Sequence, residues 1–214
     1  ATAQCVRIIP GPIDVRNDTN SGFIRSCNRG AEQARGPYLR FLHNDTTVTS
    51  GWLSALRDTF KSEANAGLVG SKLIFPDGRL QEAGGIIWRD ASGVNYAKGD
   101  HPDKPEYNYV REVDYCSGAC VLISRVFFEQ IGGFDAVYAP AYYEDTDLDF
   151  KVRKAGRKVY YQPFSVVLHH EGQTSGRSTE SGVKSYQLVN QTKFRTKWTR
   201  DLSRGQSAPI TPER

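Results

Sequence analysis

Apolar residues recur along the chain with two different periods, and each change of period marks an expected helix or strand. Residues 21–35 show the three- and four-residue spacing of an amphipathic helix. Ser21 can cap its start, and Gly36 with Pro37 would end it. The apolar run 38–42 that follows predicts a buried strand. The apolar face of the expected helix consists of Phe23, Ile24, Cys27, Ala31 and Ala34.

A second amphipathic segment, residues 51–62, predicts a helix, and the apolar run 66–75 predicts the next strand. Strand, helix and strand in this order form a βαβ unit, which favours a parallel sheet with helices on its faces. We therefore expect an α/β fold with a mostly parallel central sheet. The buried face of the second helix would consist of Trp52, Leu53, Leu56 and Phe60.

The middle of the chain, residues 76–113, is rich in Gly, Asp and Pro, with short apolar pieces between turn signals. This pattern predicts a hairpin and a long loop over one end of the sheet, and loops of this length are often functional. A buried strand is expected at 113–124, followed by a short helix that Gly132 and Gly133 end. The small residues 117–119 within that strand would let a ligand or another backbone approach closely.

The last third of the chain predicts two helices and two strands. A helix is expected at 144–155, ended by Gly156, then short strands at 158–162 and 165–170, and a final amphipathic helix at 181–198. The residues expected to face the core are Leu148, Val152 and Ala155 in the first helix and Tyr186, Val189, Phe194 and Trp198 in the last.

The two ends of the chain differ from its centre. Short strands are expected at 5–9 and 13–15, and a parallel sheet would need further strands beside them. The chain has no methionine, so we interpret it as a segment of a longer protein. Residues 1–200 would form one domain, and the polar, Pro-containing stretch 201–214 a flexible tail.

Composition and charge limit the classes of partner. No apolar run reaches the roughly 20 residues that cross a bilayer, and no secretory signal is visible at the start. The net charge of +4 suits an anionic small substrate or a peripheral membrane contact, and it is too weak and dispersed for nucleic-acid binding.

The four cysteines favour a reducing compartment. Cys116 and Cys120 have the spacing of half a zinc knuckle, but no second Cys/His pair is placed to complete it. We expect these residues, with Cys5 and Cys27, to be free thiols that pack as small apolar groups. Free thiols are typical of the cytoplasm.

Three polar clusters fall at expected strand ends or at a helix start: Asn44 with Asp45, Glu144 with Asp145, and His169 with His170. One carboxylate and one imidazole could hold a divalent cation. The carboxylate pair at a helix start could take a proton, because a helix N-terminus favours the ionised form. Together the clusters suggest a metal-assisted site with a base.

From the sequence alone, each of these residues could also have a purely structural role. Asp45 could serve only in a turn, and Asp145 could simply cap its helix. Asp147 and Asp149 look like solvated first-turn charges that suit the helix dipole. Alternation along a strand sends one of the two adjacent histidines inward, so at most one should be a ligand.

Five segments, in order, resemble the family 2 glycosyltransferases of the GT-A fold. The resemblance is nearest to the rhamnosyltransferase-like and galactofuranosyltransferase-like modules of bacterial surface-polysaccharide (O-antigen) synthesis. Each motif is modest, and the ordered set is specific. The segments are 20–53, 67–88, 113–135 (VDYCSGACVLISR and GGFD), 142–156 (YYEDTDLDFKVRKAG) and 166–176 (VVLHHEGQTSG).

On the donor side, the resemblance implies a nucleotide-diphospho-sugar and a divalent metal, Mn²⁺ or Mg²⁺. Asp45 matches the last aspartate of the DXD-type motif that binds this metal, and His169 matches the histidine ligand. His43 stands where the first aspartate would be, so its contribution, like that of His170, is open. The residues implied to contact the donor are Asn20, Gly22, Asn28 and Asn44, and Gly118 in the sugar pocket.

On the acceptor side, the resemblance implies that Asp145 is the general base and that Glu144 orients the acceptor or the base. The reaction would be one inverting displacement onto a hydroxyl of a glycan or lipid-linked acceptor, in the cytoplasm or at the inner face of the membrane. Selection of the sugar would lie in loop contacts around 81–109.

The resemblance is incomplete before Asn20. Family members begin with a strand ending in PxYN-like residues and continue to a DDGS-like segment, and neither is matched. We therefore expect residues 1–214 alone to transfer little or no sugar. Two other readings are a non-catalytic glycan-binding or scaffold module of the same fold, and a nucleotidyltransferase, which would want a Gly- and Lys-rich phosphate loop.

Overall fold

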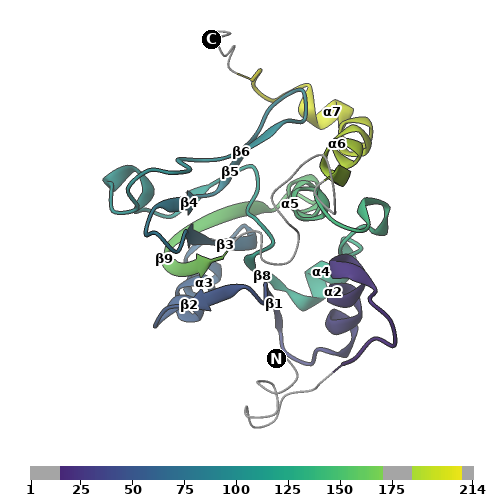
Figure 1. The fold of residues 1–214 in the computed structure, drawn as a ribbon, viewed down its shortest axis with the longest axis horizontal. Coiled ribbons are helices and arrows are strands. Elements are labelled where there is room, and N and C mark those ends of the chain that lie inside the picture. The colour runs from purple at the N-terminus through teal and green to yellow at the C-terminus, as the bar shows by residue number, and fades with distance from the viewer. Residues whose placement is uncertain (1–14, 171–184, 209–214) are drawn as a thin grey trace.

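A single curved sheet organises the molecule. In the computed structural model, which describes residues 15–170 and 185–208, its strands follow the order β1-β8-β3-β9-β2, with β4 beside β3 and β7 beside β9 (Figure 1). The expected strand at 5–9 and nearly all of that at 13–15 lie outside the described residues. The strands are β1 (Tyr38–Leu42), β2 (Thr46–Val48), β3 (Ala66–Ile74), β4 (Leu80–Glu82), β7 (Arg111–Glu112), β8 (Cys120–Ser124) and β9 (Lys158–His169).

The sheet is mixed, which corrects the expectation of mostly parallel pairing. β1, β3 and β9 do run in one direction, as the strand-helix-strand pattern predicted, but β8 lies antiparallel between β1 and β3. Among the described strands, β3 with β9 is the parallel pair. A short apolar strand carries no mark of its direction, so the sequence could not show that β8 would insert there.

Two strand boundaries also differ from prediction. The strand expected at 113–124 begins only at Cys120, because residues 116 and 117 are irregular and lead into a turn at 118–119. The strands expected at 158–162 and 165–170 are one strand, β9, whose register against β3 slips after Gln162. Pro163 follows this point and has no amide hydrogen to donate, which explains a bulge rather than a break.

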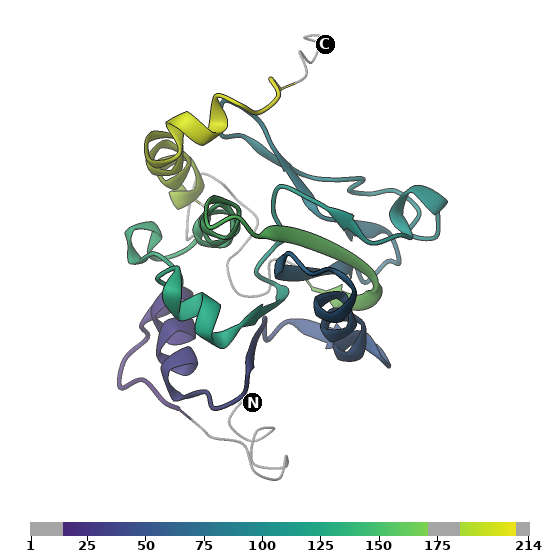
Figure 2. The ribbon, with the colours of Figure 1, turned by 180° about the vertical axis from the view of Figure 1, so that it is seen from behind.

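Helices cover both faces of the sheet. α3 (Trp52–Ser62) lies behind β9 in Figure 1 and in front of it in Figure 2, and its Leu56 belongs to the same core cluster as Leu122 and Cys120 of β8. The alternate residues of β8, Val121 and Ile123, face the larger core beneath the other helices. These are α2 (Gly22–Gln33), α4 (Arg125–Gln130), α5 (Glu144–Lys154), α6 (Tyr186–Lys197) and α7 (Thr199–Leu202).

Some residues expected in the core are exposed. Leu53 is 43% exposed, and Thr59 takes its place in the buried stripe of α3. In α6, Tyr186 and Val189 are exposed, whereas Asn190 is fully buried and donates to three backbone carbonyls of residues 138–142. Ala155 of α5 is also exposed. A polar residue that satisfies buried carbonyls cannot be distinguished from a surface residue by hydropathy.

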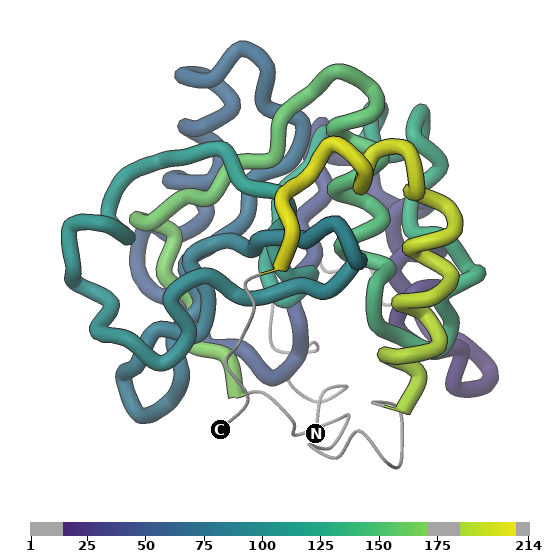
Figure 3. Tube along the Cα trace, turned by 90° about the horizontal axis from the view of Figure 1, so that it is seen from above, coloured from purple at the N-terminus to yellow at the C-terminus, as the bar shows by residue number. Residues whose placement is uncertain are grey.

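The C-terminal helices close one edge of the larger core. Figure 3 shows α6 along one side of the molecule, where Phe194 and Trp198 pack on Phe150 of α5. The predicted boundary at residue 200 falls inside α7, and Leu202 beyond it is 4% exposed. Packing therefore continues at least to residue 206, whose carbonyl accepts the amide of Arg89.

The glycine-rich middle of the chain contains the expected hairpin, formed by β5 (Gly85–Ile87) and β6 (Gly93–Asn95). A long loop follows, with a short 3-10 helix at Pro105–Tyr107, and it returns to the sheet through β7. A small separate core of Leu80, Ala83, Tyr107 and Tyr161 supports this loop.

Of the four cysteines, Cys27, Cys116 and Cys120 are free thiols, as expected, and Cys5 lies outside the described residues. None of the helices in residues 15–170 and 185–208 is both long and apolar enough to span a bilayer.

Candidate active site

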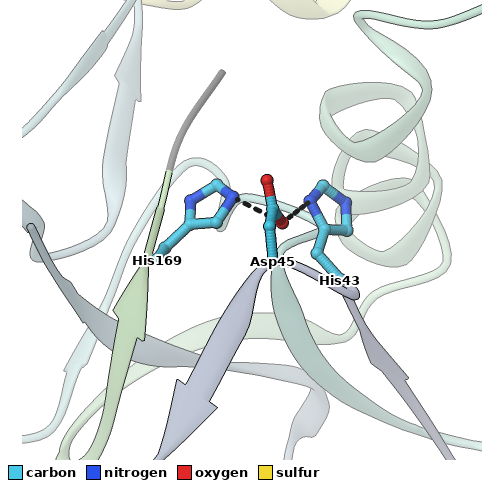
Figure 4. A group of neighbouring side chains, drawn as sticks. All are labelled: His43, Asp45 and His169. Atoms are coloured by element: carbon cyan, nitrogen blue, oxygen red, sulfur yellow. Dashed lines mark ion pairs between the residues drawn. The ribbon is translucent and has the colours of Figure 1, made fainter. Parts of the chain in front are cut away.

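Two histidines and an aspartate form a compact cluster at one end of the sheet (Figure 4). His43, Asp45 and His169 each offer one ligand atom, and these atoms all lie within 4.8 Å of one another. Asp45 Oδ1 is 3.4 Å from His169 Nε2 and 3.9 Å from His43 Nδ1. In Figure 4 the two rings approach the carboxylate from opposite sides.

Strand pairing fixes the three side chains in place. β1 pairs with β8 up to its last residue, and the amide of His43 then donates to the carbonyl of Ala119. β2 begins at Thr46, which lies opposite His169 on β9. Because β1 and β2 stand at opposite ends of the strand order, the turn 43–45 is held by a different partner strand at each end.

The donor set of this cluster fits a divalent cation. Burial, and then the neighbouring His169, lowers the pKa of His43, so its imidazole is neutral at pH 7 and has a lone pair to offer. Gln81 Nε2 lies 3.0 Å from His169 Nδ1, which leaves Nε2 as the ring nitrogen that faces Asp45. Two imidazoles and a carboxylate suit Mn²⁺ better than Mg²⁺, which prefers oxygen ligands.

The adjacent histidines at the end of β9 follow the predicted alternation. His169 is 7% exposed and joins the cluster. His170 is half-buried, and its backbone amide donates to the carbonyl of Asp45 at 2.9 Å. The sequence left the part of His43 open, and the structure places it in the cluster as a third donor.

Asp145, the expected base, lies at the start of α5 and is held from two sides. Its Oδ2 accepts the amide of Gly118 at 3.1 Å, and its Oδ1 accepts the amide of Thr146 at 2.7 Å. The chain enters α5 through Tyr142 and Tyr143, which have φ values of 75° and 70°. Bulky residues rarely adopt this left-handed backbone, and such strain tends to gather at active sites.

Glu144 differs from its neighbour in being buried, with 8% exposure. Its Oε2 has no hydrogen-bond partner within the described part of the chain. Burial, together with the charge of Asp145, raises the pKa of Glu144 to about 8. Glu144 therefore keeps its proton at neutral pH, and Asp145 is the member of the pair suited to act as a base.

One aromatic ring connects the cluster of His43, Asp45 and His169 with Asp145, the expected base. The ring of Phe23 packs edge-on against His43, with centroids 5.1 Å apart. A Cβ on Gly118 would lie 3.4 Å from Asp145 Cβ and 3.8 Å from the Phe23 ring, so Gly118 fills the narrow space between them. The charge of Asp145 also acts on the pKa of His43. The two clusters thus belong to one site.

Two aspartates of α5 were predicted wrongly. Asp147 and Asp149 are both 0% exposed, whereas we expected solvated first-turn charges. Asp149 Oδ2 accepts the amide of Cys116 at 2.7 Å, on the same side of α5 as Asp145. Glu82, which the sequence gave no reason to select, accepts the amide of Ser117 at 2.9 Å. The i, i+4 spacing of Asp145 and Asp149 was the only available signal.

The residues expected to contact the donor are spread more widely. Asn20 Oδ1 accepts the amide of Gly22, whose φ is 72°, at the start of α2. Asn44 is exposed beside the cluster. The side-chain amide of Asn28 donates to the carbonyl of Phe134 at 2.8 Å and accepts the backbone amide of Phe134 at 3.0 Å. These bonds join α2 to that segment and give Asn28 a structural role.

The chain is similar in sequence to several known proteins. The sequence profile described as "Glycosyl transferase family 2" matches residues 3–132. The O-antigen biosynthesis protein RfbC of Myxococcus xanthus is 30% identical over 155 residues, which are 67% of this chain and 12% of that protein. An N-acetylglucosaminyl-diphospho-decaprenol L-rhamnosyltransferase of Mycobacterium tuberculosis is 41% identical over 76 residues, 36% of this chain and 24% of that protein. The chain thus spans less than a third of either relative.

The fold is similar to that of solved glycosyltransferases. A structure of GalNAc-T7 with UDP, GalNAc and Mn²⁺ covers 88% of this chain and 37% of that chain, with a TM-score of 0.66 and 18% identity. The mannosyltransferase PcManGT from Pyrobaculum calidifontis, in complex with GDP-Man and Mn²⁺, covers 91% of this chain and 48% of that chain, with a TM-score of 0.52. The expected GT-A fold is confirmed.

Proposed function

The chain belongs to glycosyl transferase family 2, and we propose that it catalyses inverting, metal-dependent transfer of a sugar from a nucleotide-diphospho-sugar to a hydroxyl of a glycan or lipid-linked acceptor. The observation that carries the proposal is the convergence of His43, Asp45 and His169 with Asp145 around Phe23 and Gly118. A binding or scaffold module would need neither three metal-type donors nor a partly exposed carboxylate beside them.

His43, Asp45 and His169 would hold the cation. A divalent cation bound there supplies positive charge for the diphosphate of the leaving nucleotide. The solved neighbours contain Mn²⁺ with UDP or GDP-Man, and that supports a nucleotide-sugar donor and Mn²⁺ for this chain.

Asp145 would take the proton of the acceptor hydroxyl. As the hydroxyl oxygen bonds to the anomeric carbon, the bond from that carbon to the diphosphate breaks, and the configuration inverts. Asp145 Oδ2 accepts one backbone amide and keeps a second lone pair for the acceptor hydroxyl, whereas Oδ1 accepts both the amide and the hydroxyl of Thr146. Glu144, protonated at neutral pH, would donate a hydrogen bond and leave Asp145 as the one base at this helix start.

The setting we propose is bacterial surface-polysaccharide synthesis. Similarity to RfbC and to the rhamnosyltransferase supports it, and a larger multidomain protein is the natural context because those relatives are much longer than the chain. The net charge of +4 suits a cytoplasmic site at the inner face of the membrane.

Calorimetric titration with Mn²⁺ tests the metal site directly. Asp45→Ala in the full-length protein should weaken Mn²⁺ binding by about 100-fold or more, because even residues that only orient ligands are worth about 10- to 100-fold. Asp58→Ala is the matched control, since Asp58 is an exposed aspartate whose partner is Lys61 on α3. An Asp45→Ala isotherm equal to that of the control would remove this metal site.

A further inference from the structure

Three consecutive backbone amides, those of residues 116–118, each donate to a different carboxylate. The acids come from two separate elements, β4 and α5, so they hold this short turn from both. Gly70 of β3 allows the turn to lie close, because a Cβ there would be 2.3 Å from Cys116 Cβ. The bonds join Cys116 to Asp149 Oδ2 at 2.7 Å, Ser117 to Glu82 Oε1 at 2.9 Å and Gly118 to Asp145 Oδ2 at 3.1 Å.

Glu82 and Asp149 differ from Asp145 in their surroundings. Their exposures are 1% and 0%. Glu82 Oε2 and Asp149 Oδ1 are buried and have no hydrogen-bond partner within residues 15–170 and 185–208. A buried carboxylate without a cation is costly, so burial raises the pKa of Glu82 to about 8 and that of Asp149 well above its ordinary value. Glu82 therefore acts on the turn as a neutral acid at pH 7.

Asp145 depends on this turn for its orientation. The amide of Gly118 belongs to the peptide unit that begins at Ser117, and the amide of Ser117 belongs to the unit that begins at Cys116. A rotation of either unit re-aims the Gly118 amide, because planar peptide units turn as rigid bodies. Gly118 has no side chain that would resist such a rotation.

We propose that Glu82 and Asp149 are positioning residues that fix the turn 116–118, and through the Gly118 amide the base Asp145. This inference rests on the proposed role of Asp145. The two acids contact neither donor nor acceptor in this scheme, and they serve as hydrogen-bond acceptors only. A side-chain amide has a carbonyl oxygen at the same place, so it should serve equally well.

Steady-state kinetics of the full-length protein test the proposal at Glu82. Glu82→Leu removes the acceptor for the Ser117 amide at similar volume. It should lower kcat by roughly 10- to 100-fold, the effect of a misplaced catalytic group. The donor KM and the Mn²⁺ Kd should stay within about 3-fold of wild type. Glu82→Gln should restore kcat to within about 3-fold of wild type, with an unchanged pH profile.

The matched controls are Glu112→Leu and Glu112→Gln. Glu112 is an exposed glutamate of β7 that pairs with Lys158, and neither change should affect kcat. The proposal is overturned if Glu82→Leu keeps the wild-type kcat, or if Glu82→Gln loses as much activity as Asp145→Asn. Normal transfer by Asp145→Asn would instead overturn the proposed function.

Amide hydrogen exchange provides a second measurement in case Glu82→Leu does not fold. The amides of residues 116–118 should be protected in the wild type, in Glu82→Gln and in Asp149→Asn. Free exchange of the Ser117 amide in the wild-type protein would contradict the proposal, since no positioning bond would then exist.

Discussion

Helix α5 carries buried acids on two sides, and the sides differ in what binds them. Asp147 faces the end of α6, and two lysines and two aromatic donors from α5, α6 and the segment before α5 surround it. Asp145 and Asp149 face the turn 116–118, where their partners are backbone amides. The partners of Asp147 are Lys151 at 3.3 Å, Lys197 at 2.7 Å, Trp198 Nε1 at 2.7 Å and Tyr138 Oη at 3.1 Å.

The difference separates a structural carboxylate from one available for chemistry. Two lysines and two aromatic donors occupy the carboxylate of Asp147, so that it joins the C-terminal helices to α5. Amides satisfy the hydrogen bonds of Asp145 but do not neutralise it, and its partial exposure leaves it open to an acceptor. Charges two residues apart on one helix thus have different functions because of what lies opposite each.

The largest expected effect comes from removing the base on the site-facing side. Asp145→Asn in the full-length protein should reduce kcat by about 100- to 10,000-fold, the usual contribution of a general base. The amide keeps the size and the Gly118 contact, so stability and the Mn²⁺ Kd should change little. Initial rates with a saturating donor provide the measurement, and near-normal turnover would remove Asp145 as the base.

On the opposite side of α5, Asp147→Ala should act on stability. It leaves two lysines, an indole N–H and a phenol without their common acceptor. We expect the free energy of unfolding to fall by about 3 kcal/mol, the lower end for a broken buried pair, since both lysines are partly exposed. Urea denaturation followed by tryptophan fluorescence measures this loss.

Glu112→Gln is the control for Asp147→Ala, because the Glu112–Lys158 pair is exposed. That change should alter the free energy of unfolding by less than about 1 kcal/mol. If Asp147→Ala lost no more stability than Glu112→Gln, the contrast between the two sides of α5 would fail.

The site-facing side should also give the stability a pH dependence. Burial, together with the nearby charge of Asp145, raises the pKa of Glu82 to about 8 from an ordinary 4.5, against the hydrogen bond from the Ser117 amide and the charge of Lys98. At a pH between 4.5 and about 8, the carboxyl group of Glu82 is ionised in the unfolded chain and protonated in the folded protein. The free energy of unfolding should therefore fall with rising pH, by up to about 1.4 kcal/mol per unit from this group, and level off above pH 8.

Glu82→Gln cannot titrate and should remove this part of the slope, so denaturation curves of both proteins between pH 5 and pH 9 provide the test. Glu144, whose pKa burial also raises to about 8, should leave a second contribution of the same sign in both. Parallel curves for the two proteins would mean that Glu82 is ionised in the folded state.

Helices and strands in which apolar residues recur at a regular spacing could be predicted from the sequence. α2, β1, α3, β3 and the hairpin lie where expected. The insertion of β8 and the continuity of β9 depend on pairing between distant segments, about which local periodicity says nothing.

The candidate site was predictable where polar residues follow strand ends. Asp45 and His169 were selected in this way, and Asp145 because it falls at an expected helix start; their roles stay predictions. Asp147 and Asp149 were misread because a charge at a helix start is usually solvated. Two of their partners, Cys116 for Asp149 and Trp198 for Asp147, lie 33 and 51 residues away in the chain, and no local pattern reveals them.

The turn between β1 and β2 has a consequence for how this chain tolerates changes of length. Its three residues span the distance between two strands that are paired with different neighbours. Adding or deleting one residue there would shift β2 by one position and reverse which side chains face inward. The ligands at 43–45 can therefore be changed by substitution, whereas insertions and deletions should be found in the surface loops instead.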